Sequence, residues 1–262
     1  MTQNVNTSSP SDHPEQPLQP EKMAKSTKPQ KNLYEPYNTP VVLYEMLRWF
    51  AKFVFAIAIH LRVFGLHNVP TEGAYIIASN HLSWTDIPLI VLRIPRKVVY
   101  MAKEEYFKSK LAWLIRFLGA FPVRRGEADR QALRAGEVQL KKGNILGIFP
   151  EGTRSRTRTL ARAHPGMGMI ALRTGVPVVP VAIWGSEKAL RTFRPRVTLS
   201  YGEPMILKPK GNKITREDID EATELVMQRI AAMMPPEYQG VYRVALPVTE
   251  PVVEDSSEAS PE

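Results

Sequence analysis

The sequence contains no cysteine, and this absence excludes disulfides, thiolate nucleophiles, thioester-forming cysteines and thiolate zinc sites. It also lacks a long uncharged apolar run. The longest such run in its most apolar segment is Phe53 to Ile59, whereas a membrane-spanning helix needs about 20 apolar residues. The first residues have no apolar stretch of the kind found in secretory signals. We therefore expect the protein to stay on the cytoplasmic side.

The net charge of +9 is unevenly distributed along the chain. Residues 1–40 hold equal numbers of acids and bases and residues 246–262 carry −5, so residues 41–245 carry +14. A body this basic favours an anionic partner, which can be nucleic acid, a phosphate-bearing substrate or the anionic surface of a bilayer. Composition does not choose among the three.

Composition divides the chain into four parts. Residues 1–38 contain six prolines and few apolar side chains, so we predict a disordered tail. Residues 246–262 are predicted to be a second disordered tail, which is acidic. Residues 39–64 are predicted to form an amphipathic helix, and residues 65–245 a folded domain.

The predicted helix at 39–64 begins at Pro40 and meets no glycine or further proline before Gly65. Glu45, Arg48 and Lys52 form one narrow polar stripe on it, and the remaining side chains are mostly aliphatic and aromatic. This pattern favours a helix that lies in the membrane interface. Two alternatives stay open, which are a soluble helix packed on the core and a membrane span.

The domain alternates predicted strands with predicted helices. Buried strands are expected at 74–79, 97–102, 144–149, 176–184 and 196–201. Helices are expected at 86–92, 104–118, 127–142, 166–174 and 216–234, the last one opened by a capping box of Thr215 and Asp218. Such alternation predicts an α/β fold with a largely parallel central sheet flanked by helices. Active residues of such sheets collect in the loops at strand ends.

His81 directly follows the strand at 74–79, and Asp86 stands five residues after it. A histidine that takes a proton needs its second ring nitrogen held by a hydrogen bond, and a carboxylate is the strongest partner for this. The pair would act like a triad whose serine is replaced by a substrate hydroxyl. A His and an Asp this close in sequence are also common without any shared role.

Three other segments carry candidate site residues. In Phe149–Ser155, Glu151 and Arg154 project after a strand, and Arg154 can bind a phosphate or form a surface ion pair with Glu151. Arg124 and Arg125 follow an apolar run and are either a second anion clamp or a solvated strand end. The nearly pure hydrocarbon segment 176–184 is a buried strand that can also line an acyl chain.

Four motifs, in this order and at comparable spacing, resemble those of the glycerolipid acyltransferase family, and within it the PlsC-like lysophosphatidate acyltransferases. Asn80–Asp86 resembles the N-H-x-S-x-x-D motif, and Gly119–Arg125 resembles G-x-x-F/P-V-x-R. Phe149–Ser155 matches F-P-E-G-T-R-S at every residue, and Val176–Pro180 resembles V-P-x-x-P-V. The resemblance covers roughly residues 60–210 and makes 65–245 the catalytic domain.

The resemblance implies a direct acyl transfer in which His81, oriented by Asp86, takes the proton of a glycerol hydroxyl. The hydroxyl then attacks the thioester of acyl-CoA or acyl-carrier protein, which are co-substrates, so no cofactor and no metal is implied. Substrate binding is assigned to the following residues: Arg124, Arg125, Glu151, Gly152, Thr153 and Arg154. The implied partners are lysophosphatidate, the acyl thioester, an anionic membrane surface and acyl-carrier protein, and nucleic acid is not among them.

The sequence departs from the family after the third motif. The family often has F-K-x-G there, whereas this chain has Ala163-His164-Pro165-Gly166. Two rivals to lysophosphatidate acylation therefore remain. One is an acyltransferase for another lysolipid, such as lyso-ornithine lipid or a lysophospholipid with a larger head, and the other is a non-catalytic basic membrane-binding relic.

Overall fold

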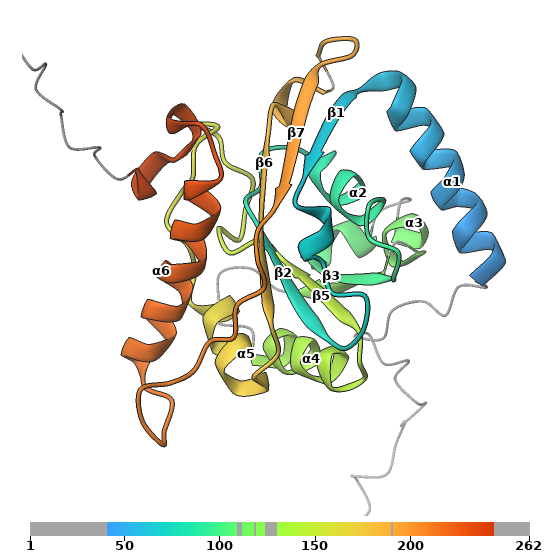
Figure 1. Ribbon diagram of the computed structural model, residues 1–262. Coiled ribbons are helices and arrows are strands. Elements are labelled where there is room, and N and C mark those ends of the chain that lie inside the picture. The colour runs from blue at the N-terminus through green and yellow to red at the C-terminus, as the bar shows by residue number, and fades with distance from the viewer. Residues whose placement is uncertain (1–40, 109–111, 118, 124–129, 190, 244–262) are drawn as a thin grey trace, which may run out of the picture. The chain divides into compact units, whose positions relative to one another are not determined.

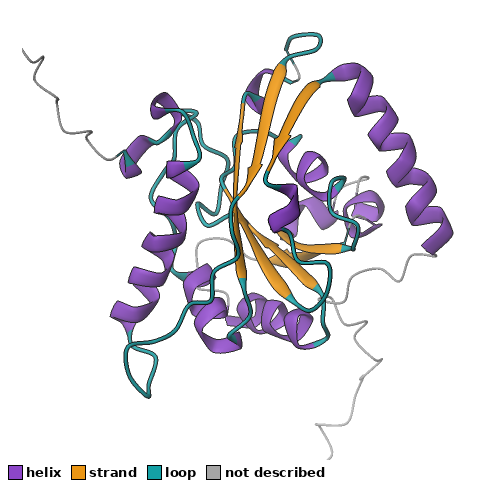
Figure 2. Ribbon diagram, viewed as in Figure 1, coloured by secondary structure: helices purple, strands orange, loops and turns teal. Residues whose placement is uncertain are grey.

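The structure is a computed structural model that describes residues 41–108, 112–117, 119–123, 130–189 and 191–243. The predicted tails at 1–38 and 246–262 lie outside the described residues. The described part is built on one seven-stranded sheet with helices on both faces (Figures 1 and 2).

The strands lie in the order β1-β7-β6-β2-β5-β3-β4. Their bounds are β1 His60–Phe64, β2 Tyr75–Ser79, β3 Val98–Lys103, β4 Ala120–Val123, β5 Ile145–Ile148, β6 Val178–Trp184 and β7 Arg196–Tyr201. All neighbouring strands pair in parallel except β6 and β7, which are antiparallel. The predicted α/β fold with a largely parallel central sheet is therefore confirmed.

In the described residues, six α-helices lie on the two faces of the sheet. Their bounds are α1 Val41–Ala58, α2 Asp86–Val91, α3 Ala112–Phe117, α4 Arg130–Lys141, α5 Gly166–Thr174 and α6 Arg216–Ala232. Short 3-10 helices are formed by Leu66–Asn68, Glu104–Lys108, Ser186–Lys188, Pro236–Tyr238 and Gly240–Tyr242. The predicted bounds of α5 agree with the structure, and the predicted capping box of Thr215 and Asp218 opens α6.

The two faces of the sheet carry separate cores because alternate side chains of a strand point to opposite sides. In β2, Ile76 and Ala78 pack toward α5 and α6, whereas Tyr75 and Ile77 pack toward α2. Figure 1 shows the first set of helices, with α4, on one side and α1, α2 and α3 on the other. The central strands are thus buried on both faces, which explains their continuous apolar sequences.

Two predicted helices were wrong in part. The helix expected over 104–118 is a 3-10 helix at Glu104–Lys108 and a separate α3 at Ala112–Phe117. The helix expected over 39–64 ends at Ala58, and His60–Phe64 forms β1, which pairs in parallel with β7. The apolar pattern of this segment is compatible with a helix, but the pairing partner lies far along the chain and leaves no trace in local periodicity. The strand β4 was not among the predicted strands, although a strand end before Arg124 was one of the two interpretations of that segment.

The described surface of α1 is apolar on its outer side. Trp49, Phe50 and Phe53 are 67%, 66% and 64% exposed. The polar stripe instead faces the body: Arg48 donates to the carbonyl oxygens of Ile94 (2.9 Å) and Pro95 (3.3 Å) and pairs with Glu45. Near the end of α1, Phe55 and Ala58 pack against the core. Within the described residues, no helix has the length and apolarity to cross a membrane.

Candidate active site

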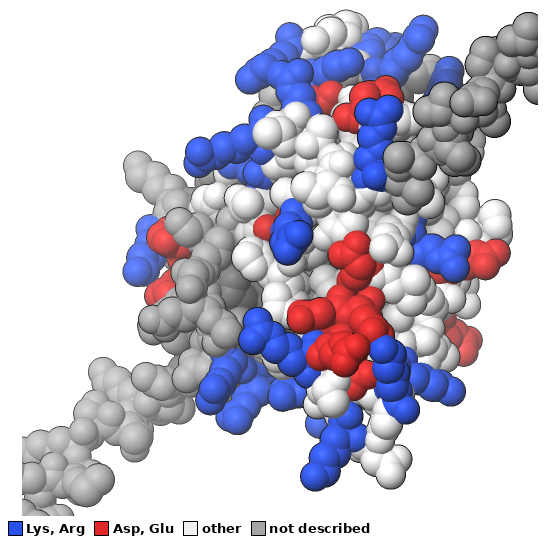
Figure 3. All heavy atoms as spheres, turned by 90° about the vertical axis from the view of Figure 1, so that its left-hand side faces the viewer, with Lys and Arg blue, Asp and Glu red and all other residues white. Residues whose placement is uncertain are grey.

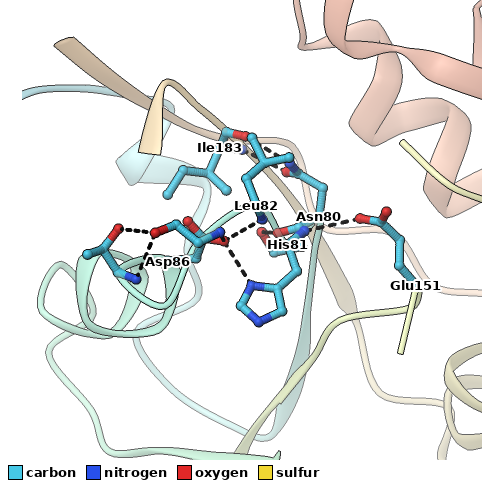
Figure 4. Close-up of polar contacts among 9 residues, drawn as sticks. Asn80, His81, Leu82, Asp86, Glu151 and Ile183 are labelled. Carbon is cyan, nitrogen blue, oxygen red and sulfur yellow. Dashed lines mark hydrogen bonds and ion pairs between the residues drawn. The ribbon is translucent and has the colours of Figure 1, made fainter. Parts of the chain in front are cut away.

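The parallel strands β2, β3, β4, β5 and β6 all end at the same edge of the sheet, and we call this the catalytic edge. His81 follows β2 there, and Asp86 is the first residue of α2. The His81 Nδ1 atom lies 2.8 Å from Asp86 Oδ2, and both residues are buried (Figure 4). The predicted pair is therefore assembled.

Asp86 Oδ2 also accepts backbone hydrogen bonds from Leu82 at 2.6 Å and Ser83 at 2.7 Å. Asp86 Oδ2 thus accepts from two backbone N–H groups and from the His81 ring. With Nδ1 donating to this oxygen, the proton of the neutral ring lies on Nδ1. The lone pair on Nε2 is then available to take a proton from a substrate.

The loop after β5 holds the backbone of His81 on both sides. The His81 N–H donates to Glu151 Oε1 at 3.1 Å, and the His81 carbonyl accepts from the Ser155 N–H at 2.8 Å. The imidazole ring stacks on Phe149, with ring centroids 4.1 Å apart and an interplanar angle of 19°. The first and third motifs of the sequence are thus one structural unit around His81.

Asn80 anchors the same loop to the neighbouring strand. Its side-chain amide donates to the Ile183 carbonyl and accepts from the Ile183 N–H, each at 2.8 Å (Figure 4). The side chain thereby reproduces a peptide group at the point where β2 ends and its ladder with β6 would stop. Because both residues are completely buried, these bonds are shielded from competing water.

The Glu151 carboxylate is nearly fully buried at 3% exposure, and its two oxygens are both used. Oε1 accepts from the His81 backbone, and Oε2 accepts from the Ala161 N–H at 3.0 Å. Burial raises the pKa of Glu151 to about 7, although the hydrogen bonds from the Ala161 and His81 backbones lower it and the Asp86 charge raises it slightly. The predicted contact of Glu151 with the acceptor stays a prediction, and the contacts seen make it a positioning residue for His81.

The residues after Glu151 form the predicted tight turn. Gly152 has a left-handed φ of 66°, and a side chain there would also lie 2.9 Å from the His164 ring. Thr153 is exposed. The Arg154 guanidinium lies 4.2 Å above the centre of the Trp84 ring, and no carboxylate of the described residues pairs with it. Its N–H groups are therefore open to an anionic ligand beside the loop that holds His81.

The remaining predicted site residues are Arg124, Arg125 and the segment 176–184. Arg124 and Arg125 lie outside the described residues. The segment 178–183 is fully buried within both cores, as expected for a strand, while its contact with an acyl chain stays a prediction. In the described part of the chain, no group of three or more His, Asp or Glu side chains is placed to hold a metal ion.

A C-terminal segment supports the loop that carries Glu151. Leu160 donates to the Tyr238 carbonyl at 2.9 Å and accepts from the Val241 N–H at 3.2 Å, and Ala163 donates to the Tyr242 hydroxyl at 3.0 Å. Gly240 has a φ of 52°, and any side chain there would meet the Leu160 carbonyl oxygen at 2.1 Å. The 3-10 helices at 236–242 therefore pack behind Ala161, which holds Glu151.

Sequence reasoning gave no role to three residues that shape this site. The Arg154 guanidinium lies over the Trp84 ring, and Phe149 stacks on His81. Asn80 bonds the loop of His81 to β6. All three stand inside the recognised motifs. Their position in the motifs marked them as part of the site, but only the structure identifies their contacts.

Comparison with known proteins agrees with this geometry. A family model described as Acyltransferase matches residues 60–184, which contain His81, Asp86 and Arg154. The 1-acyl-sn-glycerol-3-phosphate acyltransferase of Bacillus subtilis (strain 168) is 33% identical over 175 residues, which cover 65% of this chain and 86% of that protein. The lyso-ornithine lipid O-acyltransferase of Pseudomonas aeruginosa is 38% identical over 52% of this chain and 51% of its own length.

Among solved structures, the 1-acyl-sn-glycerophosphate (LPA) acyltransferase PlsC from Thermotoga maritima superposes with a TM-score of 0.58 at 35% identity. The match covers 71% of this chain and 77% of that one. Sequence and fold thus agree over the strands and loops that carry the site. The chain therefore belongs to the acyltransferase family, together with these 1-acyl-sn-glycerol-3-phosphate acyltransferases.

Proposed function

We propose that this acyltransferase moves a fatty acyl group from an acyl thioester to the free hydroxyl of lysophosphatidate and so forms phosphatidate. The observation that carries the proposal is the assembled pair of His81 and Asp86, with the free guanidinium of Arg154 resting on Trp84 of the same loop. A base and an anion site on two loops that contact each other suit an acceptor whose hydroxyl and phosphate are a few bonds apart.

The reaction follows from the protonation state of His81. Nε2 accepts the proton of the acceptor hydroxyl while the oxygen attacks the thioester carbonyl carbon, and Asp86 stabilises the imidazolium. The new C–O bond forms, the C–S bond breaks, and the thiolate takes the proton from Nε2. Binding of the phosphate by Arg154 places the hydroxyl next to the base, which lowers the barrier by proximity. The thioester comes from acyl-CoA or acyl-carrier protein.

A second acceptor has one observation in its favour, which is the 38% identity with the lyso-ornithine lipid O-acyltransferase. Thiol release by the purified protein with each lysolipid in turn separates the two. We expect kcat/KM for lysophosphatidate to exceed that for lyso-ornithine lipid and for a zwitterionic lysophospholipid at least about tenfold, because a hydrogen bond to a charged group contributes ~1.5–3 kcal/mol. Arg154→Gln should remove this preference. Faster turnover of lyso-ornithine lipid would contradict the proposal.

We further propose that the protein works at the cytoplasmic face of the cell membrane, to which α1 attaches it. Support comes from the apolar side chains on the outer surface of α1, since aromatic residues gain free energy in the bilayer interface. The net charge of +14 over residues 41–245 suits an anionic surface. Acyl-carrier protein, which is acidic, is also a partner in this proposal.

Replacing Trp49, Phe50 and Phe53 together with serine should move the protein from the membrane fraction to the soluble fraction. All three side chains are largely exposed, so the thermal midpoint should stay nearly unchanged while vesicle affinity falls about 100-fold, given ~1 kcal/mol of interfacial burial for each. Vesicle sedimentation measures the affinity.

The matched control replaces three exposed apolar residues on other elements, Ile206, Leu225 and Val241, with serine. It should leave sedimentation unchanged. Equal losses in both triple variants would show a general surface effect, and retained binding of the α1 variant would place the membrane contact elsewhere.

A further inference from the structure

The connection between β6 and β7 lies at the catalytic edge. β6 runs parallel to β2, so its end and the connection after it lie at the edge where His81 follows β2. β7 then returns antiparallel to β6, which makes residues 188–196 the tip of a hairpin. Figure 1 shows this tip projecting beyond the sheet next to the end of α1. We refer to residues 188–196, without residue 190, as the β6–β7 tip.

The β6–β7 tip combines an exposed aromatic ring with exposed cations. Phe193 is 77% exposed, a higher value than that of any other large apolar side chain in the described part of the chain. Exposed basic side chains flank it, namely Lys188, Arg191, Arg194 and Arg196. No carboxylate of the described residues forms an ion pair with them, and the nearby Glu187 accepts instead from the Tyr238 hydroxyl at 3.0 Å. Figure 3 shows Lys and Arg side chains gathered at the corresponding end of the molecule.

The backbone of the tip is tied to α1. The Arg194 N–H donates to the carbonyl of Ala58, the last residue of α1, and the His60 N–H donates to the Pro195 carbonyl, each at 3.0 Å. Arg194 has a left-handed φ of 54°, a conformation that non-glycine residues rarely adopt. The exposed position of Phe193 is thus held by specific backbone contacts at the end of a helix whose outer surface is also apolar.

We propose that the β6–β7 tip is a second membrane contact, which binds anionic headgroups through its cations and inserts Phe193 into the interface. The proposal rests on the membrane attachment proposed above and deepens it. Cations alone would also suit an acidic protein. Phe193 is largely exposed, and its loop is bonded to the end of α1, whose outer surface is also apolar. This combination favours a bilayer over an acidic protein as the partner, because one membrane can bury both apolar surfaces.

This contact gives the catalytic edge a defined orientation. α1 by itself attaches the protein but leaves it free to rotate about the helix axis. A second contact at the catalytic edge turns His81 toward the bilayer that contains the acceptor. The β6–β7 tip should therefore matter for an acceptor in a membrane and be dispensable for an acceptor dissolved in water.

The test is a full-chain variant with Lys188→Gln, Arg191→Gln and Phe193→Ser, which leaves the left-handed Arg194 in place. We expect binding to vesicles that contain phosphatidylglycerol to fall at least about tenfold, and turnover of vesicle-embedded lysophosphatidate to fall with it. Turnover of a short-chain, water-soluble lysophosphatidate should stay within about twofold of the wild type, which also shows that the variant is folded. The matched control, Ile206→Ser with Lys208→Gln and Lys213→Gln, changes the connection that follows β7 at the opposite edge.

Unchanged vesicle binding would overturn the proposal, as would an equal loss of turnover on the water-soluble acceptor. Unchanged vesicle binding with a loss confined to the acyl-carrier protein donor would identify an acidic protein as the partner and also overturn it. If no lysolipid is acylated, the proposed function fails, while the vesicle-binding comparison still decides whether the β6–β7 tip contacts membranes.

Discussion

Replacing His81 with alanine is expected to lower kcat/KM for acyl transfer by about a thousandfold or more. The imidazole is the group placed to take the hydroxyl proton, and general-base catalysis contributes roughly 10²–10⁴-fold, with further loss when the oriented pair is broken. The ring is buried against Phe149, so some stability is also lost. The measurement is thiol release with lysophosphatidate and an acyl thioester.

Two further variants separate the chemistry from the packing. Asp86→Asn keeps the shape of the side chain but removes the charge that stabilises the imidazolium, so activity should also fall by several orders of magnitude. His67→Ala, at an exposed position outside the site, should leave activity unchanged. If the His81→Ala protein keeps its fold and stays within tenfold of the wild-type rate, His81 is not the base. Vesicle binding should be the same in all three variants.

Replacing Glu151 with glutamine is expected to lower kcat by about 10- to 100-fold while the pH profile of activity changes shape. An amide has one acceptor oxygen, whereas the carboxylate accepts from both His81 and Ala161. One buried N–H is then left without a partner, which costs about 1–3 kcal/mol and displaces the backbone of His81. Glu221→Gln, at an exposed position on α6, is the control.

The pH dependence follows from the raised pKa of Glu151, which is about 7. Below that pH the carboxyl takes up a proton and accepts poorly from one of its two N–H donors. Wild-type activity should therefore fall on the acid side as Glu151 takes up a proton. The glutamine variant should lose the part due to Glu151. An acid limb of unchanged steepness in the variant would refute this role.

The same pKa shift has a defined effect on stability. The folded state holds a proton on Glu151 up to about pH 7, whereas the ordinary value of the group is 4.5. Between these values the folded state binds more protons than the unfolded state, so this group favours folding less as the pH rises. The difference in thermal midpoint, wild type minus glutamine variant, should therefore decrease between pH 5 and pH 8. Above pH 8 this difference should be constant.

Much of the central sheet was predictable because its strands are buried on both faces. The continuous apolar sequences of β2, β5 and β6 are typical of strands in a parallel sheet, and helices were predicted close to α2, α4 and α5. The helix α5 has the predicted bounds because Pro165 precedes its first residue and Gly175, with a left-handed φ of 65°, follows its last. Local sequence is sufficient for such elements, since burial alone selects their side chains.

The elements that were missed depend on distant partners. β1 has an apolar composition that suits either a helix or a strand, and its pairing with β7 decides for the strand. The outward direction of the apolar side of α1 is likewise decided by Arg48, which bonds to backbone carbonyls after α2. Neither contact is encoded in local periodicity.

The candidate site shows the same contrast between local sequence and distant contacts. The sequence by itself predicted which residues hold the chemistry, because His81 and Asp86 lie close together and Arg154 lies in a segment that matches the family motif F-P-E-G-T-R-S at every residue. Only the tertiary structure decided that the Glu151 carboxylate accepts from the His81 backbone and that Arg154 lies over the Trp84 ring. It alone also places the β6–β7 tip at the catalytic edge. The physical reason is that proton transfer needs particular types of side chain, and these can be read from the sequence. Hydrogen bonds and ring contacts between loops depend on the order of the strands in the sheet, which the sequence does not show.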